Sequence, residues 1–574
     1  MATSDKPRAR QSQLVTTYGV GSLFPAGDQS FIICGTEDWD DRFAAAVEEP
    51  RLAKSLGVHT FRSPPTGRRA GDIPVVRFPT FAYCPDCRRL ARFWEFNARK
   101  MRCEDCERDL TPSRFVACCE AGHIEDFPYF QWVHTGGHAS EGKHALRLVT
   151  RGASSSLSDI EIKCSCGLSR SLAGSFSSAA LVGVRSCKGK RPWLPGAPDE
   201  QCDKRLRVLQ RGSSNVWFAA VRSALSIPPW SGPAHRLVSR NWDLLKNAAG
   251  PDLEGRLSEL AAGSKGVTVA ELREVVERRL GLHSSAGGDF SEQKLRTQEY
   301  EALSKGNDAG SRDNFQCEPK AVGSRLSGVV AQVSAVNRLR EVRALQGFSR
   351  VTPKTGETPD SPLAPLSAQP VGWLPATEVL GEGVFVRLDE AFVERWESDP
   401  EVVSRHASLE QSMKQRAEEY EAGNAGETPS PRFVAVHSLA HALLQELSLE
   451  AGYPVGSLRE RIYADTGQAG ILIYTASSDA AGSLGGLAAL ARTEVLERMV
   501  VAAVRRAAWC SNDPVCREAG PSGSDGLNLA ACHACMLLPE TSCEHRNIFL
   551  DRAALVGTHE ESPAPLMATL EKED

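Results

Sequence analysis

The hydrophobic and polar positions of this 574-residue chain divide it into six segments. Short apolar runs broken by proline and glycine in the first segment predict an irregular or β-rich cap, and similar runs in the second predict a β-rich region. Helical spacing of apolar residues dominates the third, a Pro- and Thr-rich linker with a connecting stretch follows, and the fifth mixes helix and strand before a polar tail. The segments are 1–80, 81–215, 216–350, 351–432, 433–555 and 556–574.

One helix is defined at both ends by its sequence. Thr268 and Glu271 form a capping box, and Gly281 supplies a stop signal. The apolar residues between them recur at the spacing of one buried helix face: Val269, Leu272, Val275, Val276 and Leu280. The predicted fold class is α+β and multidomain, with a zinc-ribbon-like β-rich N-terminal half, a helical middle and an α/β zinc-binding C-terminal domain.

Composition narrows the functional classes. Lys and Arg (67) nearly balance Asp and Glu (72), so the net charge of −5 excludes a wholly basic protein that coats nucleic acid. The longest apolar stretch, around 497–509, is broken by Arg505 and Arg506 and cannot span a bilayer. The N-terminus lacks the apolar core of a signal peptide, so we expect a cytoplasmic protein with no membrane partner. Its 17 cysteines therefore need an explanation other than disulfides.

Two Cys-x-x-Cys pairs, fifteen residues apart, open the second segment. Each pair supplies two thiolates from one turn, and two such turns complete a tetrahedral zinc site. A redox motif needs one such pair in a thioredoxin-like context, and no βαβ pattern surrounds these. The spacing predicts a structural zinc site with these ligands: Cys84, Cys87, Cys103 and Cys106.

A second set of cysteines follows at looser spacing. A tight Cys-x-Cys pair precedes two single cysteines, all within 39 residues. We interpret them as a second zinc site, and the alternative is ordinary half-buried cysteine in a β-rich segment. The predicted ligands are Cys164, Cys166, Cys187 and Cys202.

A third set near the C-terminus offers five thiols for four positions. The Cys-x-x-Cys pair Cys532 and Cys535, together with Cys543, supplies three ligands. Cys516 is the predicted fourth, with Cys510 as the alternative, and His533 inside the pair could substitute. Three zinc ions are thus predicted for the chain.

Two histidine-containing patterns stay open. Cys118, Cys119 and His123 could form a two-ligand arm, but a buried cysteine beside a hydrogen-bonded histidine is favoured. His437 and His441 have the spacing of a helical zinc site, yet the residue after the first is serine rather than the glutamate of a zincin. A structural pair is therefore favoured over a catalytic one.

Segment 183–212 is basic although the whole chain is not. It carries eight Lys or Arg residues against three carboxylates, with Trp193 inside it and Trp217 just beyond it. Cations interleaved with aromatic rings suit contact with phosphates and bases, and a solvated positive face is the alternative. The predicted nucleic-acid contacts are Lys188, Lys190, Arg191, Lys204, Arg205 and Arg207.

Motifs for nucleotide hydrolysis and acyl transfer are missing from the sequence. No G-x-x-x-x-G-K-[ST] loop exists to hold a triphosphate, and no G-x-S-x-G elbow is present. We therefore expect no ATPase activity from the chain itself.

Four long stretches resemble the DrmB-type proteins of bacterial DISARM antiphage systems: RQSQLVTTYGVGSL (10–23), FVACCEAGHIEDFPYFQW (115–132), QRGSSNVWF (210–218) and NRLREVRALQGFSR (337–350). The stretch from HSLAHALL to Arg552 resembles a C-terminal domain shared with some superfamily 2 helicases, in which four cysteines hold zinc. Residues Cys532, Cys535, Cys543, Asn547, Leu550, Asp551 and Arg552 occupy that domain's recurring positions.

The resemblance implies a non-ATPase subunit that binds a separate superfamily 2 helicase, DrmA, and acts with it on invading DNA, single-stranded or with single-stranded ends. Two other functions stay open. One is a metal-dependent nuclease or hydrolase that uses His437 and His441, although no cluster of carboxylates for a hard cation stands out. The other is a stand-alone zinc-ribbon protein that binds nucleic acid.

Overall fold

The structure is a computed structural model, and it describes residues 7–66, 72–96, 101–135, 144–151, 156–284, 291–307, 313–354, 362–419, 428–475, 486–518, 520–523, 526–558 and 564–571. The chain forms two compact units. The first contains residues 1–48, 56–223 and 343–377, and the second contains 49–55, 224–342 and 378–574. Each unit is therefore assembled from segments that are distant in the sequence.

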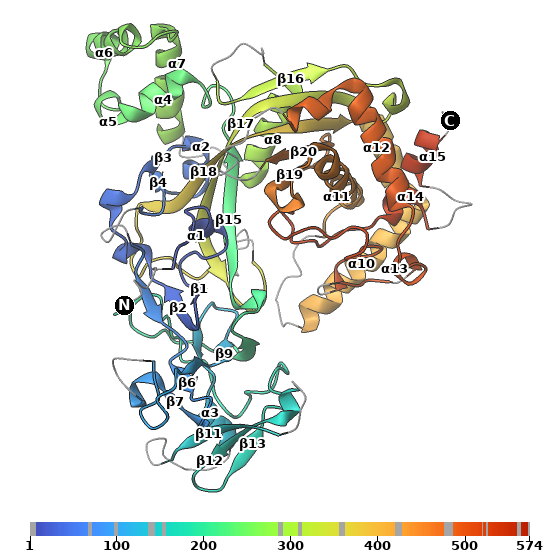
Figure 1. Cartoon of the computed structure of the whole chain (residues 1–574). Helices are drawn as coiled ribbons and strands as arrows, with labels where there is room; N and C mark the ends of the chain where they lie inside the picture. Colours follow the sequence, from blue (N-terminus) through green and yellow to red (C-terminus); the bar gives the residue numbers. More distant parts are fainter. Residues whose placement is uncertain are drawn as a thin grey trace. The chain divides into compact units, whose positions relative to one another are not determined.

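Small sheets build the first unit (Figure 1). One has the order β1-β2-β5, another β10-β9-β14, and the largest β13-β12-β11-β7-β6-β8. Their strands are β1 (Leu23–Ala26), β2 (Gln29–Ile33), β5 (Val75–Arg77), β6 (Phe81–Tyr83), β7 (Arg89–Arg92), β8 (Thr111–Pro112), β9 (Phe115–Cys118), β10 (Ile124–Asp126), β11 (Leu146–Thr150), β12 (Ile160–Cys164), β13 (Ser169–Ser171) and β14 (Arg207–Gln210). The unit also holds α1 (Gln13–Thr16), α3 (Tyr129–Val133), β3 (Ala46–Val47) and β4 (Thr60–Arg62).

Strand β9 is apolar on both faces because each face meets a different core. Phe115 and Ala117 pack into one hydrophobic cluster, whereas Val116 and Cys118 pack into another. Alternate strand residues point to opposite faces, so FVAC reads as a fully buried strand rather than an alternating one. The antiparallel partner β10 returns after a tight turn whose Gly122 has a φ of +89°. That turn carries Cys119 and His123.

The second unit contains most of a mixed sheet of order β15-β17-β18-β20-β19, with β16 paired to β17. Its strands are β15 (Phe218–Leu225), β16 (Gln316–Lys320), β17 (Val330–Ser349), β18 (Trp373–Leu388), β19 (Leu458–Tyr463) and β20 (Gly470–Thr475). Most of β15 (218–223) and the ends of β17 (343–349) and β18 (373–377) belong to the first unit.

Helices fill the remainder of the second unit: α2 (Pro50–Ser55), α4 (Pro233–Arg240), α5 (Trp242–Leu245), α6 (Gly250–Ala262), α7 (Val269–Ser284), α8 (Glu292–Lys305), α9 (Glu390–Glu397), α10 (Pro400–Glu419), α11 (Pro431–Ala451), α12 (Thr493–Ala507), α13 (Val515–Glu518), α14 (Ala553–Val556) and α15 (Pro565–Glu571). Helix α11 lies beside β19, β20 and α12 (Figure 1). It is buried nearly all round, as expected of a helix that is apolar on every side. Among the described residues, no helix has the length and apolar character needed to cross a membrane.

The predicted α+β class is confirmed, and three local predictions can be compared with the structure. The capping box is present, because Thr268 N donates to Glu271 at 2.7 Å and Glu271 N donates to Thr268 Oγ1 at 3.2 Å. The helix continues past Gly281 to Ser284. The third segment is not helical throughout, since it ends in the 20-residue strand β17. Residues 355–361 of the predicted linker lie outside the described residues, while Leu366 is buried in the core of the first unit.

Candidate metal centres

Five groups of four donor side chains occur in the described part of the chain, with the ligand atoms of each group within 4.8 Å of one another. They are group 1 (Cys84, Cys87, Cys103, Cys106), group 2 (Cys119, His123, Cys187, Cys202), group 3 (His134, His144, Cys164, Cys166), group 4 (His437, His441, Glu460, Cys543) and group 5 (Cys510, Cys516, Cys532, Cys535). A tetrahedral zinc ion with bonds of about 2.3 Å to sulfur has sulfur–sulfur edges of about 3.8 Å. That edge length tests each group.

Group 1 consists of two turns with the same backbone geometry. Cys84 N bonds to Arg89 O and Cys103 N bonds to Arg108 O, at 3.0 and 2.8 Å. In both turns the residue after the second cysteine has a positive φ, at Arg88 and Glu107. The Sγ atoms of Cys87 and Cys103 are 3.8 Å apart, which is the zinc edge.

The residues between the two turns of group 1 cover the site in part. Phe96 is 3% exposed and belongs to the same hydrophobic cluster as Cys84 and Cys103. Trp94 is 47% exposed and is not part of that cluster. The structure thus brings together the four cysteines that the spacing predicts.

Group 2 is assembled at the β9–β10 turn. Cys119 Sγ lies 3.7 Å from Cys187 Sγ and 3.9 Å from Cys202 Sγ, and His123 Nδ1 lies 3.4 Å from Cys119 Sγ. All of these distances agree with the edges of a zinc tetrahedron that has three sulfur ligands and one nitrogen ligand. Gly189 N also donates to Cys187 Sγ at 3.4 Å.

A chain of charged groups orients the histidine of group 2. His123 Nε2 lies 2.8 Å from Glu200 Oε2, and Glu200 Oε1 in turn lies 2.6 Å from Arg191 Nη1. A carboxylate on the far nitrogen fixes the tautomer of a metal-ligating histidine and raises its basicity. Arg191 therefore positions Glu200 for group 2.

Group 3 consists of His134, which directly follows α3, His144, which precedes β11, and Cys164 and Cys166 at the end of β12. His134 Nδ1 lies 2.8 Å from Phe130 O, which leaves the lone pair of the ring on Nε2, 3.4 Å from Cys166 Sγ. His144 Nδ1 lies 3.4 Å from Cys164 Sγ. The backbone N–H of Leu168, with Cys164 and His134, lowers the pKa of Cys166 to about 6, so the thiolate that metals bind predominates at neutral pH.

Group 5 is formed by residues 510–535, which follow α12 in the chain. Cys532 Sγ is 3.6 Å from Cys510 Sγ and 3.7 Å from Cys535 Sγ, and Cys516 Sγ is 3.7 Å from Cys535 Sγ. Burial raises the pKa of Cys532, but N–H groups of Ala534 and Asn512 outweigh it and bring that pKa to about 7. His533 is exposed and is not part of the group.

Group 4 is the most buried of the five. His437 and His441 are one turn apart on α11, Glu460 lies on β19, and Cys543 comes from the C-terminal segment. His437 Nε2 is 3.0 Å from Glu460 Oε1 and 3.3 Å from Cys543 Sγ. Burial lowers the pKa of His437 and favours its neutral form, which is the form that binds metals.

Two of the predicted groupings differ from the structure. The four cysteines of the second set do not meet, because Cys164 and Cys166 join group 3 while Cys187 and Cys202 join group 2. The five thiols of the third set do not compete, because Cys510 and Cys516 both enter group 5. Cys543 lies instead in group 4, beneath α11. The described residues therefore form five candidate groups where the sequence predicted three sites.

The predicted nucleic-acid contacts differ in how far they are exposed. Lys188, Lys190, Lys204 and Arg205 are exposed. Lys190 lies 3.9 Å from Asp199, and Arg191 is held by Glu200. Arg207 is half-buried, with Glu120 at 4.0 Å.

The prediction that the Trp193 ring stacks on bases is wrong. This residue is 0% exposed, and its Nε1 donates to Pro365 O at 3.0 Å. It cannot stack on a base in this structure. Any contact with nucleic acid in this segment therefore depends on charge.

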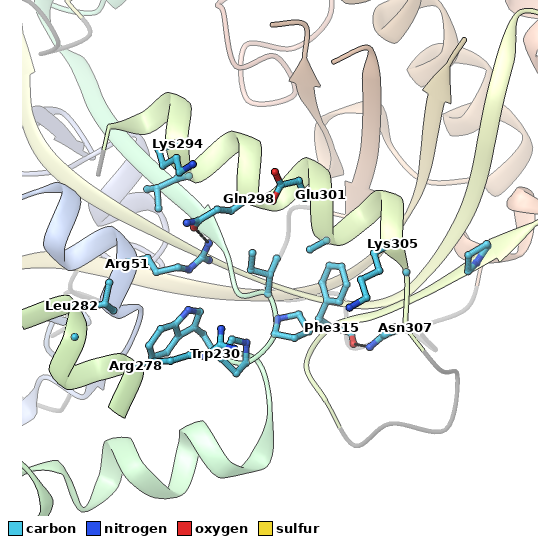
Figure 2. Close-up of a pocket in the computed structure, with 18 residues that line it drawn as sticks. Arg51, Trp230, Arg278, Leu282, Lys294, Gln298, Glu301, Lys305, Asn307 and Phe315 are labelled. Carbon is cyan, nitrogen blue, oxygen red and sulfur yellow. Dashed lines mark hydrogen bonds between the residues drawn. The ribbon is translucent and has the colours of Figure 1, made fainter. Parts of the chain in front are cut away.

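A second cationic feature is a cavity of about 960 Å³ in the second unit (Figure 2). Helix α8 contributes Lys294 and Lys305, α7 contributes Arg278, and α2 contributes Arg51. Among the described lining residues, Glu301 is the single carboxylate, and the rings of Trp230 and Phe315 also line the cavity. Arg51 is in addition paired with Glu49 at 3.1 Å. Such a lining suits a ligand that carries phosphate.

Arg350 joins four distant stretches of the first unit. It is 0% exposed and donates to three carbonyl oxygens: Gly122 at 2.8 Å, Val216 at 2.6 Å and Gly21 at 2.7 Å. Gly21, Gly122, Val216 and Arg350 belong respectively to the four stretches that carry the family resemblance (10–23, 115–132, 210–218 and 337–350). The resembling stretches thus meet at one buried guanidinium.

Comparison with known proteins supports the sequence resemblance. The chain is 29% identical to the DISARM protein DrmB of Bacillus paralicheniformis over 561 residues, which cover 95% of this chain and 99% of that protein. The resemblance to DrmB is confirmed. Residues 10–218 match a domain of unknown function (DUF8724), and residues 439–536 match the MrfA Zn-binding domain. All four cysteines of group 5 fall within the Zn-binding match, so that match and the Cys/His groups together point to zinc as the cofactor of this DrmB relative.

Sequence reasoning missed His134, His144 and Glu460 and undervalued Cys119 and His123. Glu460 stands in a stretch with no other candidate ligand at a short spacing, whereas the His-x3-His spacing of His134 and His138 was a usable signal. The Cys-x3-His spacing of Cys119 and His123 was a usable signal. Its partners lie more than sixty residues further along, where spacing gives no guidance.

Proposed function

We propose that this protein is a zinc-containing component of a DISARM antiphage system that works beside a superfamily 2 helicase and has no ATPase activity of its own. The observation that carries this proposal is the similarity to DrmB, which extends over 95% of the chain. The lack of a phosphate-binding G-x-x-x-x-G-K-[ST] loop supports a division of labour in which the partner hydrolyses ATP.

Zinc in this proposal has a structural role. Groups 1, 2, 3 and 5 each provide four donors, which leaves no open coordination position for a substrate or a reactive water. Four zinc ions are thus proposed for these groups, one more than the sequence predicted. The ions of groups 1, 2 and 3 would tie together loops that the small sheets of the first unit cannot hold by apolar burial alone.

The partner is tested by purification from the native gene cluster. A tagged chain should retain a helicase subunit through size exclusion, and the purified complex should hydrolyse ATP when DNA is added. The isolated chain should show no turnover. A chain that purifies alone and still hydrolyses ATP would contradict the proposed division of labour.

Defence is tested in cells by plaque assay. Changing Cys84 and Cys87 together to Ser should abolish protection against phage and lower the amount of soluble protein, because group 1 loses half of its ligands. Changing Cys34 to Ser is the control, since Cys34 is buried in the same unit but lies outside every group. Full protection by the double variant would show that group 1 is dispensable.

Contact with DNA is proposed at the exposed cations beside group 2. Changing Lys188 and Lys204 to Glu should weaken binding of single strands equally for all sequences. The log–log salt slope should become shallower by about 1.4, at about 0.7 for each lost contact. Changing Lys294 and Lys305 to Glu tests the cavity of Figure 2 instead. If the first pair has no effect and the second does, the DNA site lies at the cavity and not beside group 2.

A further inference from the structure

We propose that group 4 is a metal site in its own right: His437, His441, Glu460 and Cys543 bind a divalent transition metal, with zinc the ion that fits best. It would be a fifth ion in the chain. The neighbouring group 5 already has four cysteines, so it needs no ligand from group 4. The match to the Zn-binding domain spans 439–536 and leaves His437 and Cys543 outside it.

The first argument is the burial of four polar side chains at one point. His437, His441 and Glu460 are 0% exposed, and Cys543 is 5% exposed. They come from α11, β19 and the C-terminal segment, and around them lies the largest apolar core of the second unit. Burying a carboxylate and two imidazoles there is costly unless each of their polar atoms has a partner.

The second argument is the direction of the lone pairs. His441 Nδ1 lies 2.8 Å from Met536 O and can only donate to a carbonyl, so Nε2 carries the lone pair. That nitrogen lies 3.4 Å from Glu460 Oε1, which is also an acceptor. Neither His441 Nε2 nor Glu460 Oε2 has a hydrogen bond. Acceptors that face one another need a proton or a metal ion between them, and a proton on His441 Nε2 would lack a well-aligned acceptor because that atom makes no hydrogen bond.

A simple hydrogen-bonded pair does not account for these atoms. If His437 donated its Nε2 proton to Glu460, the 3.0 Å contact between them would be explained. His441 Nε2 would still lack a donor inside an apolar core. A metal ion would meet the Nε2 atoms of His437 and His441, the Glu460 carboxylate and Cys543 Sγ at once.

The third argument is the environment of the sulfur. The backbone N–H groups of His545 and Asn547 both donate to Cys543 Sγ, each at 3.3 Å. Two such donors stabilise a thiolate, as they do around zinc-bound cysteines. His437 Nε2 lies 3.3 Å from this sulfur, close to the nitrogen–sulfur edge of about 3.5 Å in a zinc tetrahedron.

The charge and the chemical softness of the four ligands identify the ion. Two neutral imidazoles, one carboxylate and one thiolate carry two negative charges, so a divalent cation makes the buried site neutral. Imidazole and thiolate are borderline or soft ligands that favour zinc over magnesium or calcium. With four donors and no exposed approach, the site is closed, and its role is to fix the C-terminal segment to α11 and β19.

Anomalous diffraction on crystals of the unaltered protein tests the site directly. Data collected on both sides of the zinc absorption edge should give a dispersive difference peak between His437 Nε2, His441 Nε2, Glu460 and Cys543 Sγ, as well as one at group 5. A peak at group 5 with none at group 4 would overturn the proposal. A peak at group 4 that appears at the edge of another transition metal would keep the site and correct the ion.

Metal content of variants provides the second measurement. Changing His441 to Gln should lower the zinc content of the folded chain by one ion, measured by inductively coupled plasma mass spectrometry. Changing Cys317 to Ser is the matched control, because Cys317 is equally buried in the same unit but outside every group. An unchanged zinc content in the soluble His441→Gln chain would refute the site. If that variant does not fold, the diffraction result decides.

Discussion

Replacing Arg350 with Met should destabilise the first unit although it removes a buried charge. The guanidinium satisfies three buried carbonyl oxygens, on Gly21, Gly122 and Val216. Each carbonyl that loses its donor costs about 2 kcal/mol, so the three together cost about 6 kcal/mol. Methionine fills similar space but donates nothing.

Removal of the charge offsets part of this cost. Burial lowers the pKa of Arg350 to about 10, from an ordinary value above 12, so keeping the charged form buried costs about 3 kcal/mol. The net loss is therefore about 3 kcal/mol. For a unit of about 250 residues, this corresponds to a fall of about 6–12 °C in the unfolding temperature.

Pulse proteolysis along a thermal ramp, read by mass spectrometry, assigns each newly cleaved peptide to its unit. The shift should appear in peptides of the first unit. Changing Arg42 to Met is the control, since Arg42 is 79% exposed and its ion pair with Asp40 is at the surface, where such pairs contribute little to stability. If Arg350→Met melts within about 2 °C of the control, the three-carbonyl account is refuted.

Three further outcomes are expected. Changing Gly189 to Ala should release one zinc ion, because Gly189 has a φ of +65° and a Cβ there would lie 1.8 Å from Glu200 O. Gly196→Ala is the control: Gly196 has a φ of +87° but no atom within 4 Å of the added Cβ, so this variant should retain the ion. Changing Arg191 to Gln should weaken zinc binding at group 2 by about 10–100-fold in a chelator competition, with the other groups unchanged, because Glu200 loses its partner. Burial and neighbouring arginines lower the pKa of His235 to about 3. Below pH 6.5 the unfolded chain therefore takes up a proton at this residue that the folded chain does not. The free energy of unfolding should fall as the pH falls, by about 2 kcal/mol at pH 5. His235→Gln should lose that part of the acid sensitivity in urea titrations at pH 7 and pH 5.

The ligands that sequence could place are those joined by one turn of chain. Cys84 with Cys87 and Cys532 with Cys535 lie three residues apart, so local geometry alone holds each pair together. The capping box at Thr268 is local in the same sense. Such features depend on a few consecutive residues, and the remainder of the fold cannot change them.

The ligands that sequence could not place depend on how strands pair. Cys164 meets His144 because β11 and β12 run side by side, and Leu146 pairs with Cys164. Cys543 is near Cys535 in sequence, but the chain passes under α11 before reaching it, where it meets His437. Spacing carries no information about either path, because both are set by the packing of apolar faces elsewhere.

Groups 2 and 3 interleave along the chain, and this affects how the first unit can acquire its metal. In the order of synthesis their ligands are Cys119, His123, His134, His144, Cys164, Cys166, Cys187 and Cys202. Before Cys187 is made, Cys119 and His123 together with Cys164 and Cys166 amount to a set of three thiolates and one imidazole. Zinc prefers that set to one with two thiolates.

At 5–20 residues per second, the ribosome takes about 1–4 s to cover the 21 residues from Cys166 to Cys187. During that interval the softer, non-native set is complete and the native group 2 is not. An ion captured by that set would have to exchange Cys119 and His123 for His134 and His144 when Cys187 and Cys202 complete group 2. For any chain that captures metal in this way, maturation includes a ligand-exchange step as well as metal capture.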